Sequence, residues 1–128
     1  MELLLAEIGI ESAHDLLLRL HFDGAFQFQT GGVMVVASQP EAEAAAQTWL
    51  TQALAGKANR RDVADLLLQA WWCLQDNKTF NESIPSESVR QAGWRAATQG
   101  RMVEMGWLAR SNLRLARYET LTLTQLGL

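Results

Sequence analysis

The chain has 128 residues, of which 48% are hydrophobic and 20% are charged, a balance that is typical of a soluble globular domain and excludes a disordered chain. One cysteine and two histidines exclude an internal disulfide framework and a Cys₂His₂ zinc site. The start, MELLLAEIGI, lacks the basic region of a signal peptide, and no apolar run reaches the roughly 18 residues of a membrane span. We therefore expect a cytoplasmic protein that does not bind membranes.

The net charge of -3 hides an uneven distribution. Residues 1–56 carry one cation and seven anions, whereas residues 57–128 carry ten cations and seven anions. Between residues 89 and 118 there are six arginines and a single acidic residue, Glu104. Arginine has a planar fork of donors that suits phosphates and guanine edges. The arginine-rich part therefore indicates a nucleic-acid surface, although such a run can also be a solvated face.

In chain order, the sequence first predicts a short helix over residues 2–8 and a second helix from Ser12, where Ser12 and Asp15 have capping-box spacing. Residues 25–29 and 33–37 are predicted to form a β-hairpin whose turn contains Gly31 and Gly32. This glycine pair lacks the lysine and the spacing of a phosphate-binding loop.

The middle of the chain predicts two helices. Ser38 and Glu41 form a capping-box pattern with Pro40 in the first turn, so a helix is expected over 39–55. Residues 56–59 are the candidate linker. Apolar residues then recur at three-and-four spacing over 60–76, and Trp71 lies on that stripe, so we expect it in the core and not as a stacking platform for bases.

The last third predicts shorter elements. Residues 77–82 form a polar loop, and a helix starts at Ser86 and stops at Gly93. A further helix covers 94–105 and ends at Gly106, with Trp94, Met102 and Met105 directed to the core. Residues 107–109 form a short strand, a turn begins at 111–112, and the alternation of 118–124 predicts a half-buried strand.

From about residue 60 to 127 this order resembles the winged helix-turn-helix superfamily. Residues 86–93 (SESVRQAG) resemble its positioning helix and turn, and 94–105 (WRAATQGRMVEM) its recognition helix. Residues 102–108 are similar to its exit into the first wing strand, 110–118 to the wing, and LTQLG at 123–127 to its common ending. The implied fold is α+β: an acidic helix–hairpin–helix region, 1–58, packed on a winged helix-turn-helix, 59–128.

The resemblance implies a protein that binds double-stranded DNA, as a small transcriptional regulator or as a subunit of a nucleoprotein complex. The residues expected to read or approach bases are Arg95, Thr98, Gln99 and Arg101. The residues expected to hold phosphates are Arg90, Arg110, Asn112, Arg114 and Arg117. We expect the arginines to converge on one face, and ion pairs with acids of the first 56 residues would count against nucleic acid.

Other functions remain open. The winged-helix face could instead bind a protein, as an adaptor without nucleic acid. His14 and His21, with Asp15, Asp23 and Glu11 nearby, could be drawn as a metal or general-base site, but surface histidines are the commoner case; we predict no enzyme, no cofactor and no metal. Because a two-stranded hairpin is marginal alone, residues 1–56 are expected to pack on the rest of the chain, form a homodimer or bind a partner protein.

Overall fold

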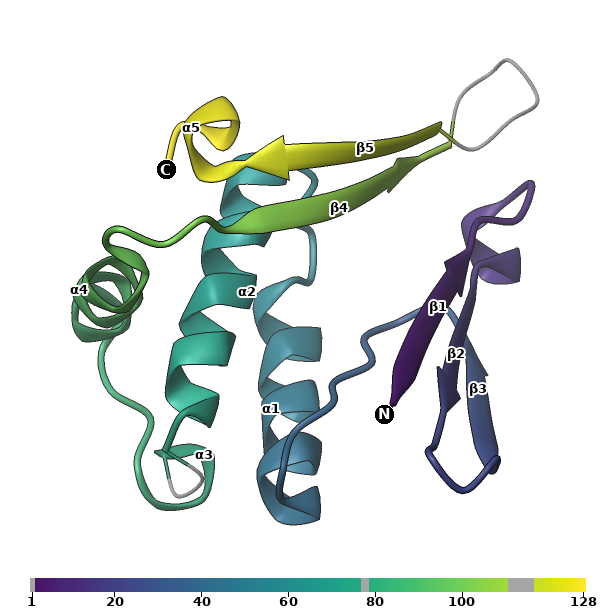
Figure 1. The fold of residues 1–128 in the computed structure, drawn as a ribbon, viewed down its shortest axis with the longest axis horizontal. Helices are drawn as coiled ribbons and strands as arrows, with labels where there is room; N and C mark the ends of the chain where they lie inside the picture. The colour runs from purple at the N-terminus through teal and green to yellow at the C-terminus, as the bar shows by residue number, and fades with distance from the viewer. Residues whose placement is uncertain (1, 77–78, 111–116) are drawn as a thin grey trace. The chain divides into compact units, whose positions relative to one another are not determined.

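The computed structural model describes residues 2–76, 79–110 and 117–128 and is a mixed α+β structure with two small antiparallel sheets (Figure 1). The α+β class predicted from the sequence is thus confirmed. The strands are β1 Leu3–Glu7, β2 Leu16–Leu20, β3 Phe26–Thr30, β4 Glu104–Ala109 and β5 Arg117–Thr122. The helices are α1 Pro40–Ala53, α2 Arg60–Leu74, α3 Thr79–Glu82, α4 Glu87–Thr98 and α5 Leu123–Leu126, with a 3₁₀ turn at Ser12–His14.

The contacts divide the chain into two compact units. Unit 1 comprises Met1–Met34 and Gly106–Thr120, and unit 2 comprises Val35–Met105 and Leu121–Leu128. Unit 1 contains the sheet β1–β2–β3, whereas unit 2 contains the helices. The predicted boundary after residue 58 falls inside unit 2, between α1 and α2, which pack against each other.

The two helices predicted near the N-terminus are wrong, because this part of the chain forms antiparallel strands. β2 is the central strand and pairs with β1 on one side and β3 on the other. Its sequence, LLLRL, has leucine at positions that alternate between both faces of the sheet, so the two-residue period is hidden. The predicted capping box also fails: Asp15 instead accepts a hydrogen bond from the Gly9 N–H at 3.1 Å.

The predicted hairpin of 25–29 with 33–37 is wrong in its partner. β3 pairs with β2, and residues 33–37 are not a strand. The hairpin turn lies earlier, at Asp23 and Gly24, where the Asp23 carboxylate accepts from the Ala25 N–H at 2.9 Å and Gly24 has a φ of 87°. The glycine pair that was expected to turn does have positive φ, 65° at Gly31 and 79° at Gly32.

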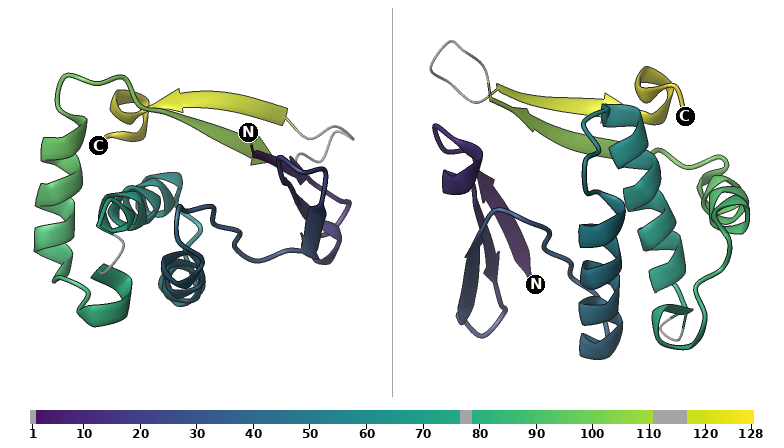
Figure 2. Two further views of the ribbon diagram at one scale, coloured as in Figure 1. Left: turned by 60° about the horizontal axis from the view of Figure 1, so that its bottom comes forward. Right: turned by 180° about the vertical axis from the view of Figure 1, so that it is seen from behind.

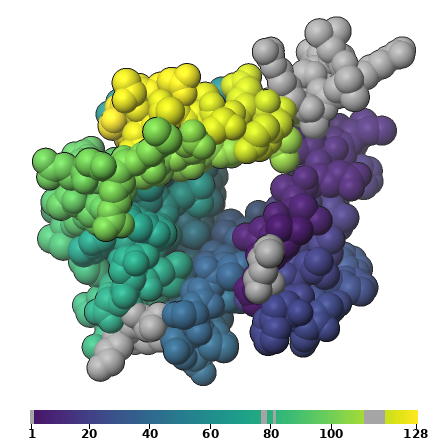
Figure 3. All heavy atoms as spheres, in the orientation of Figure 1, coloured from purple at the N-terminus to yellow at the C-terminus, as the bar shows by residue number. Residues whose placement is uncertain are grey.

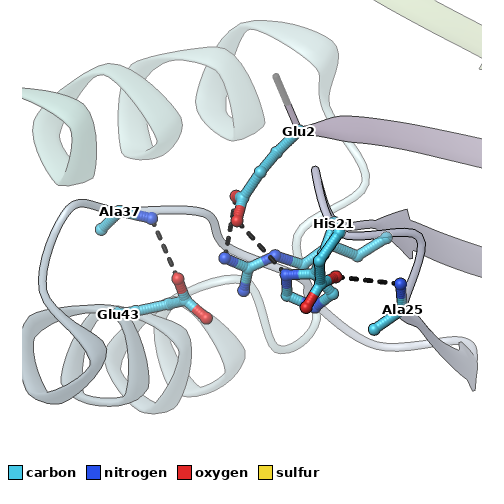
Figure 4. Close-up of polar contacts among 7 residues, drawn as sticks. Glu2, His21, Ala25, Ala37 and Glu43 are labelled. Carbon is cyan, nitrogen blue, oxygen red and sulfur yellow. Dashed lines mark hydrogen bonds and ion pairs between the residues drawn. The ribbon is translucent and has the colours of Figure 1, made fainter.

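The two central helices are confirmed as α1 and α2. α1 has Pro40 in its first turn as expected, but its N-cap is Gln39, whose side chain makes no capping hydrogen bond. The Glu43 carboxylate accepts instead from the Ala37 N–H at 3.0 Å, just before the helix (Figure 4). α2 is capped by Asn59, whose side chain accepts from the Arg61 N–H at 2.8 Å.

The predicted pair of helices over 86–105 is a single helix, α4. Gly93 lies inside it, and the chain leaves the helical conformation after Gln99, followed by Gly100 with a φ of 72°. α4 crosses the α1–α2 pair at a steep angle (Figures 1 and 2). Gly106, expected to end a helix, lies in the strand β4. The helix-turn-helix boundaries assigned from the sequence are therefore wrong.

The two strands predicted near the C-terminus are confirmed as β4 and β5, which pair with each other. The expected turn at 111–112 lies outside the described residues. β5 ends at Thr122 and not at 124, because Thr122 and Gln125 form a capping box that starts α5. Among the described residues no helix has the length and apolar character that a membrane span requires.

Candidate nucleic-acid interface

The inner side of α4 fixes how this helix is rotated about its axis. Trp94 is 2% exposed, and its indole N–H donates to Asp65 Oδ1 on α2 at 2.9 Å. The Gln91 amide donates to Asp65 Oδ2 at 2.9 Å. Gly93 lies so close to Trp72 that a Cβ there would be 2.2 Å from Trp72 Cε2. Three consecutive turns of the helix are thus attached to α2, and the expected position of Trp94 in the core is confirmed.

The outer side of α4 follows from this attachment. Exposed residues recur at three-and-four spacing along the helix, so they form one continuous stripe; we call it the outer stripe of α4. Its members are Ser88, Ala92, Arg95, Ala96 and Gln99. The Arg95 guanidinium carbon lies 5.4 Å from the centroid of the Trp94 ring, so the buried indole supports an exposed arginine.

Arg90 does not belong to this stripe, although it was expected to hold a phosphate. Its Nε donates to the Gln69 side-chain oxygen at 2.7 Å, and its Nη1 donates to the carbonyl of Pro85. Its guanidinium carbon is 5.1 Å from the centroid of the Trp49 ring. Because Gln69 is fully buried, Arg90 serves a polar network inside unit 2, and its donors are already used.

Thr98, which was expected to approach bases, is 7% exposed, and its hydroxyl donates to the Trp94 carbonyl at 2.9 Å. This expectation is wrong, because Thr98 lies four residues after Trp94 and shares its inner side. Gln99 and Arg101 are exposed, as expected. Arg101 is placed just beyond the helix, where its backbone N–H donates to the Thr98 carbonyl at 2.9 Å.

An open groove of about 480 Å³ lies beside Arg101. It is bordered by Trp71, which is 37% exposed, and by Met102, which is 85% exposed, so the expectation that these two residues are core is wrong. Met102 follows the helix because α4 ends early. Trp71 points away because the α2 face that meets α4 includes Trp72, and neighbouring helix positions differ by about 100°.

The expected wing residues give a mixed outcome. Arg110, in unit 1, donates from Nη2 to both oxygens of Asp15, at 2.7 and 2.8 Å, and from Nη1 to the Gly9 carbonyl. The hydrogen bond from Arg110 lowers the pKa of Asp15 below its ordinary value. Asn112 and Arg114 lie outside the described residues, as does the side chain of Arg117. One of the six arginines is therefore paired with an acid of the first 56 residues.

The other candidate chemistry was assigned to histidines. His21 Nδ1 lies 3.3 Å from Glu2 Oε1, and Arg19 Nη2 donates to Glu2 Oε2 at 2.9 Å (Figure 4). These contacts lower the pKa of Glu2, with the hydrogen bond from Arg19 as the largest cause. His14 lies in the 3₁₀ turn. Across residues 2–76, 79–110 and 117–128, no three His, Cys, Asp or Glu side chains are close enough together to hold a metal ion.

The sequence stage missed Asp65, which organises the inner side of α4. Asp65 Oδ2 also accepts from the Gln69 amide at 2.7 Å, so one carboxylate serves three side chains. The signal available in the sequence is the four-residue spacing of Asp65 and Gln69 on a strongly periodic helix. In comparisons with known proteins, the chain matches no known family, no curated protein and no solved structure.

Proposed function

We propose that the chain binds double-stranded nucleic acid and that the outer stripe of α4 lies in the major groove. The observation that carries this proposal is that Arg95 and Gln99 are both exposed, one turn apart on the same stripe. Arginine pairs with the O6 and N7 edge of guanine, and glutamine with the N6 and N7 edge of adenine. Two side chains that suit base edges thus share one side of a helix.

The rest of the stripe supports close approach to a groove. Its other members, Ser88, Ala92 and Ala96, are small, so the helix backbone can come near the floor of the groove without a steric barrier. The acidic residue of α4 is Glu87, in the first turn, at the opposite end of the helix from Arg95 and Gln99. Arg101 adds a cation just beyond the helix, within reach of the phosphate backbone.

The order of elements supports the same proposal. α2, the short α3, α4 and then β4 and β5 follow one another as in the winged helix-turn-helix superfamily, with α4 in the place of the reading helix. In this assignment α3, and not residues 86–93, is the positioning helix. A role as a small regulator or as a subunit of a nucleoprotein complex is part of the proposal.

Two of the residues expected to hold phosphates, Arg90 and Arg110, already donate to groups within the chain. We therefore rest the proposal on α4 and Arg101 alone. With few cations and a net charge of -3, the affinity should be modest and should fall steeply as salt is added.

A salt-titrated binding measurement tests the proposal. Fluorescence anisotropy with a labelled random duplex should show binding at low salt. Arg95→Ala should weaken binding by about tenfold or more, equivalent to about 1–3 kcal/mol. Arg61→Ala, which removes an exposed arginine from α2, is the matched control, because it changes the net charge equally and leaves the outer stripe of α4 intact.

Two results would contradict the proposal. One is that the parent protein does not bind duplex at low salt; the alternative drawn from the sequence, a protein-interaction module, then becomes the better explanation. The other is that Arg95→Ala and Arg61→Ala weaken binding equally, which would mean that the duplex senses net charge and not the outer stripe of α4.

A further inference from the structure

Unit 1 has no apolar core of its own. Among the described residues, all the buried hydrophobic side chains lie in unit 2, and the one buried residue of unit 1 is Arg19, at 8% exposure. Yet the sheet of unit 1 is rich in leucine and phenylalanine. A small sheet is stable in water only when one of its faces packs on another layer, so this sheet is missing a layer.

The pairing register shows which face is apolar. Side chains alternate between the two faces of a sheet, so residues in the same rank of the register share a face. One rank is Leu3, Leu20 and Phe26, the next is Leu5, Leu18 and Phe28, and the end rank is Glu7, Leu16 and Thr30. We call the first two ranks the leucine–phenylalanine face, which contains no polar side chain.

This face is open to solvent. Phe26 and Phe28 are 67% and 62% exposed, and Leu3, Leu5 and Leu20 are 43%, 48% and 38% exposed. Strands β1 to β3 form the purple to dark-blue part of the surface in Figure 3. Taking about 200 Å² for each large side chain, these five expose on the order of 500 Å². A contiguous apolar patch of that size on a small protein marks an interaction surface.

The opposite face of the sheet is different in kind. It carries Arg19 and Gln27 in one rank and Leu17 and Gln29 in another. Arg19 pairs with Glu2 there, and the Gln29 amide donates to the carbonyls of Gly31 and Val33 at 3.0 and 2.9 Å. The polar groups of the sheet are thus used on this side, which leaves the leucine–phenylalanine face as the side to be covered.

We propose that the leucine–phenylalanine face packs against the same face of a second copy of the chain. Because both ranks are uncharged, bringing two identical faces together places no like charges against each other. A two-fold axis along β2 lays β1 of one copy over β3 of the other. Leucines then face phenylalanines across the interface, which is the alternation of small and large side chains that fills a layer well.

The same axis also aligns the polar end of each sheet. Ranks stay at the same height along the strands, so Glu7 lies over Thr30 of the second copy and not over leucine. Leu18, in the middle of the central strand, lies next to its own copy across the axis. The area of about 500 Å² per chain is below the roughly 800 Å² of a standard interface, so we expect a dimer that dissociates in the micromolar range.

Sedimentation velocity of the full chain over a concentration series tests the dimer. The parent should shift from monomer to dimer, Phe28→Ser should remain a monomer, and Gln27→Ser, on the other face of the same strand, should behave as the parent. Since Phe28 is largely exposed in the single chain, its replacement should leave the circular dichroism spectrum unchanged. A parent that stays monomeric at all concentrations, or a Phe28→Ser dimer, would overturn the proposal.

Cross-linking tests the geometry independently. Under mild oxidation Leu18→Cys should form a disulfide-linked dimer, whereas Leu17→Cys, on the opposite face, should not. The native Cys73 is buried, and burial raises the pKa of its thiol, so the parent is a suitable unreactive control. A dimer that fails to cross-link through Leu18, as pairing between the edges of two sheets would give, also overturns the proposal. None of these outcomes depends on nucleic-acid binding.

Discussion

At the residue scale, the carboxylate of Asp65 accepts hydrogen bonds from three side chains on two helices. Gln69 comes from its own helix, and Gln91 and Trp94 come from α4. Because Gln69 and Trp94 are almost wholly buried, water cannot replace the carboxylate as their acceptor. Asp65 therefore holds α4 at one rotation about its axis, and this rotation decides which residues reach the outer stripe.

Replacing Asp65 by alanine should cost about 2–4 kcal/mol of unfolding free energy, since it leaves buried donors without an acceptor. Asp62→Ala, an exposed acid one turn earlier on α2, should cost only about 0.3–1 kcal/mol through the helix dipole. Urea unfolding followed by tryptophan fluorescence measures both variants. If the two costs are equal, Asp65 does not anchor α4.

The sequence carries only part of this site. Arg95, Gln99 and Arg101 could be selected because their residue types suit base edges, and they are exposed. Arg90 and Thr98 could not be separated from them, because selection by residue type ignores which side of the helix faces inward. That side is set by Asp65 and Trp72 on α2, forty or fewer residues away in sequence but with no local pattern that links them to α4.

At the scale of elements, the contact between α2 and α4 depends on Gly93. A glycine in a helix usually costs about 1 kcal/mol relative to alanine, and the sequence analysis accordingly interpreted Gly93 as a helix stop. Here the missing Cβ makes room for the Trp72 indole. The helix continues through Gly93 because close packing of two helices outweighs the local propensity.

Gly93→Ala should therefore destabilise the protein by about 1–3 kcal/mol through overpacking, despite the gain in helix propensity. In the background of Trp72→Leu the same substitution should be neutral or stabilising, because the indole is gone. A double-mutant cycle from urea unfolding measures the coupling between the two positions. A loss of stability that is the same in both backgrounds would show that Gly93 is needed for some reason other than Trp72.

The leucine-rich start shows why strand and helix were confused. A central strand with apolar residues on both faces loses its alternation, and LLLRL then fits a helix as well as a strand. α1 and α2 were predicted correctly because each has one apolar side along several turns, a pattern that no strand can imitate. Long periodic elements were thus predictable, whereas short ones depended on partners distant in sequence.

At the scale of the whole molecule, charge along the sequence and charge in each unit differ. The first 56 residues have a strongly negative sum, yet unit 1 also contains Arg110, which pairs with Asp15. Burial is divided as well, because the buried hydrophobic side chains of the described residues all belong to unit 2. Unit 2 thus has the core of an ordinary domain, and unit 1 needs a partner for its sheet.

This division predicts how amide hydrogen exchange depends on protein concentration. Amides of α2 lie in the core of unit 2, so they should exchange slowly and at the same rate in dilute and concentrated samples. Amides of β2 should exchange faster in the dilute sample and slow down in the concentrated one, because association stabilises only the associated sheet by mass action. Exchange measured by mass spectrometry at concentrations below and above the dimer midpoint gives both rates at once. If β2 is protected equally in both samples, the sheet is stable without a second copy, and the layer it needs must come from within the chain.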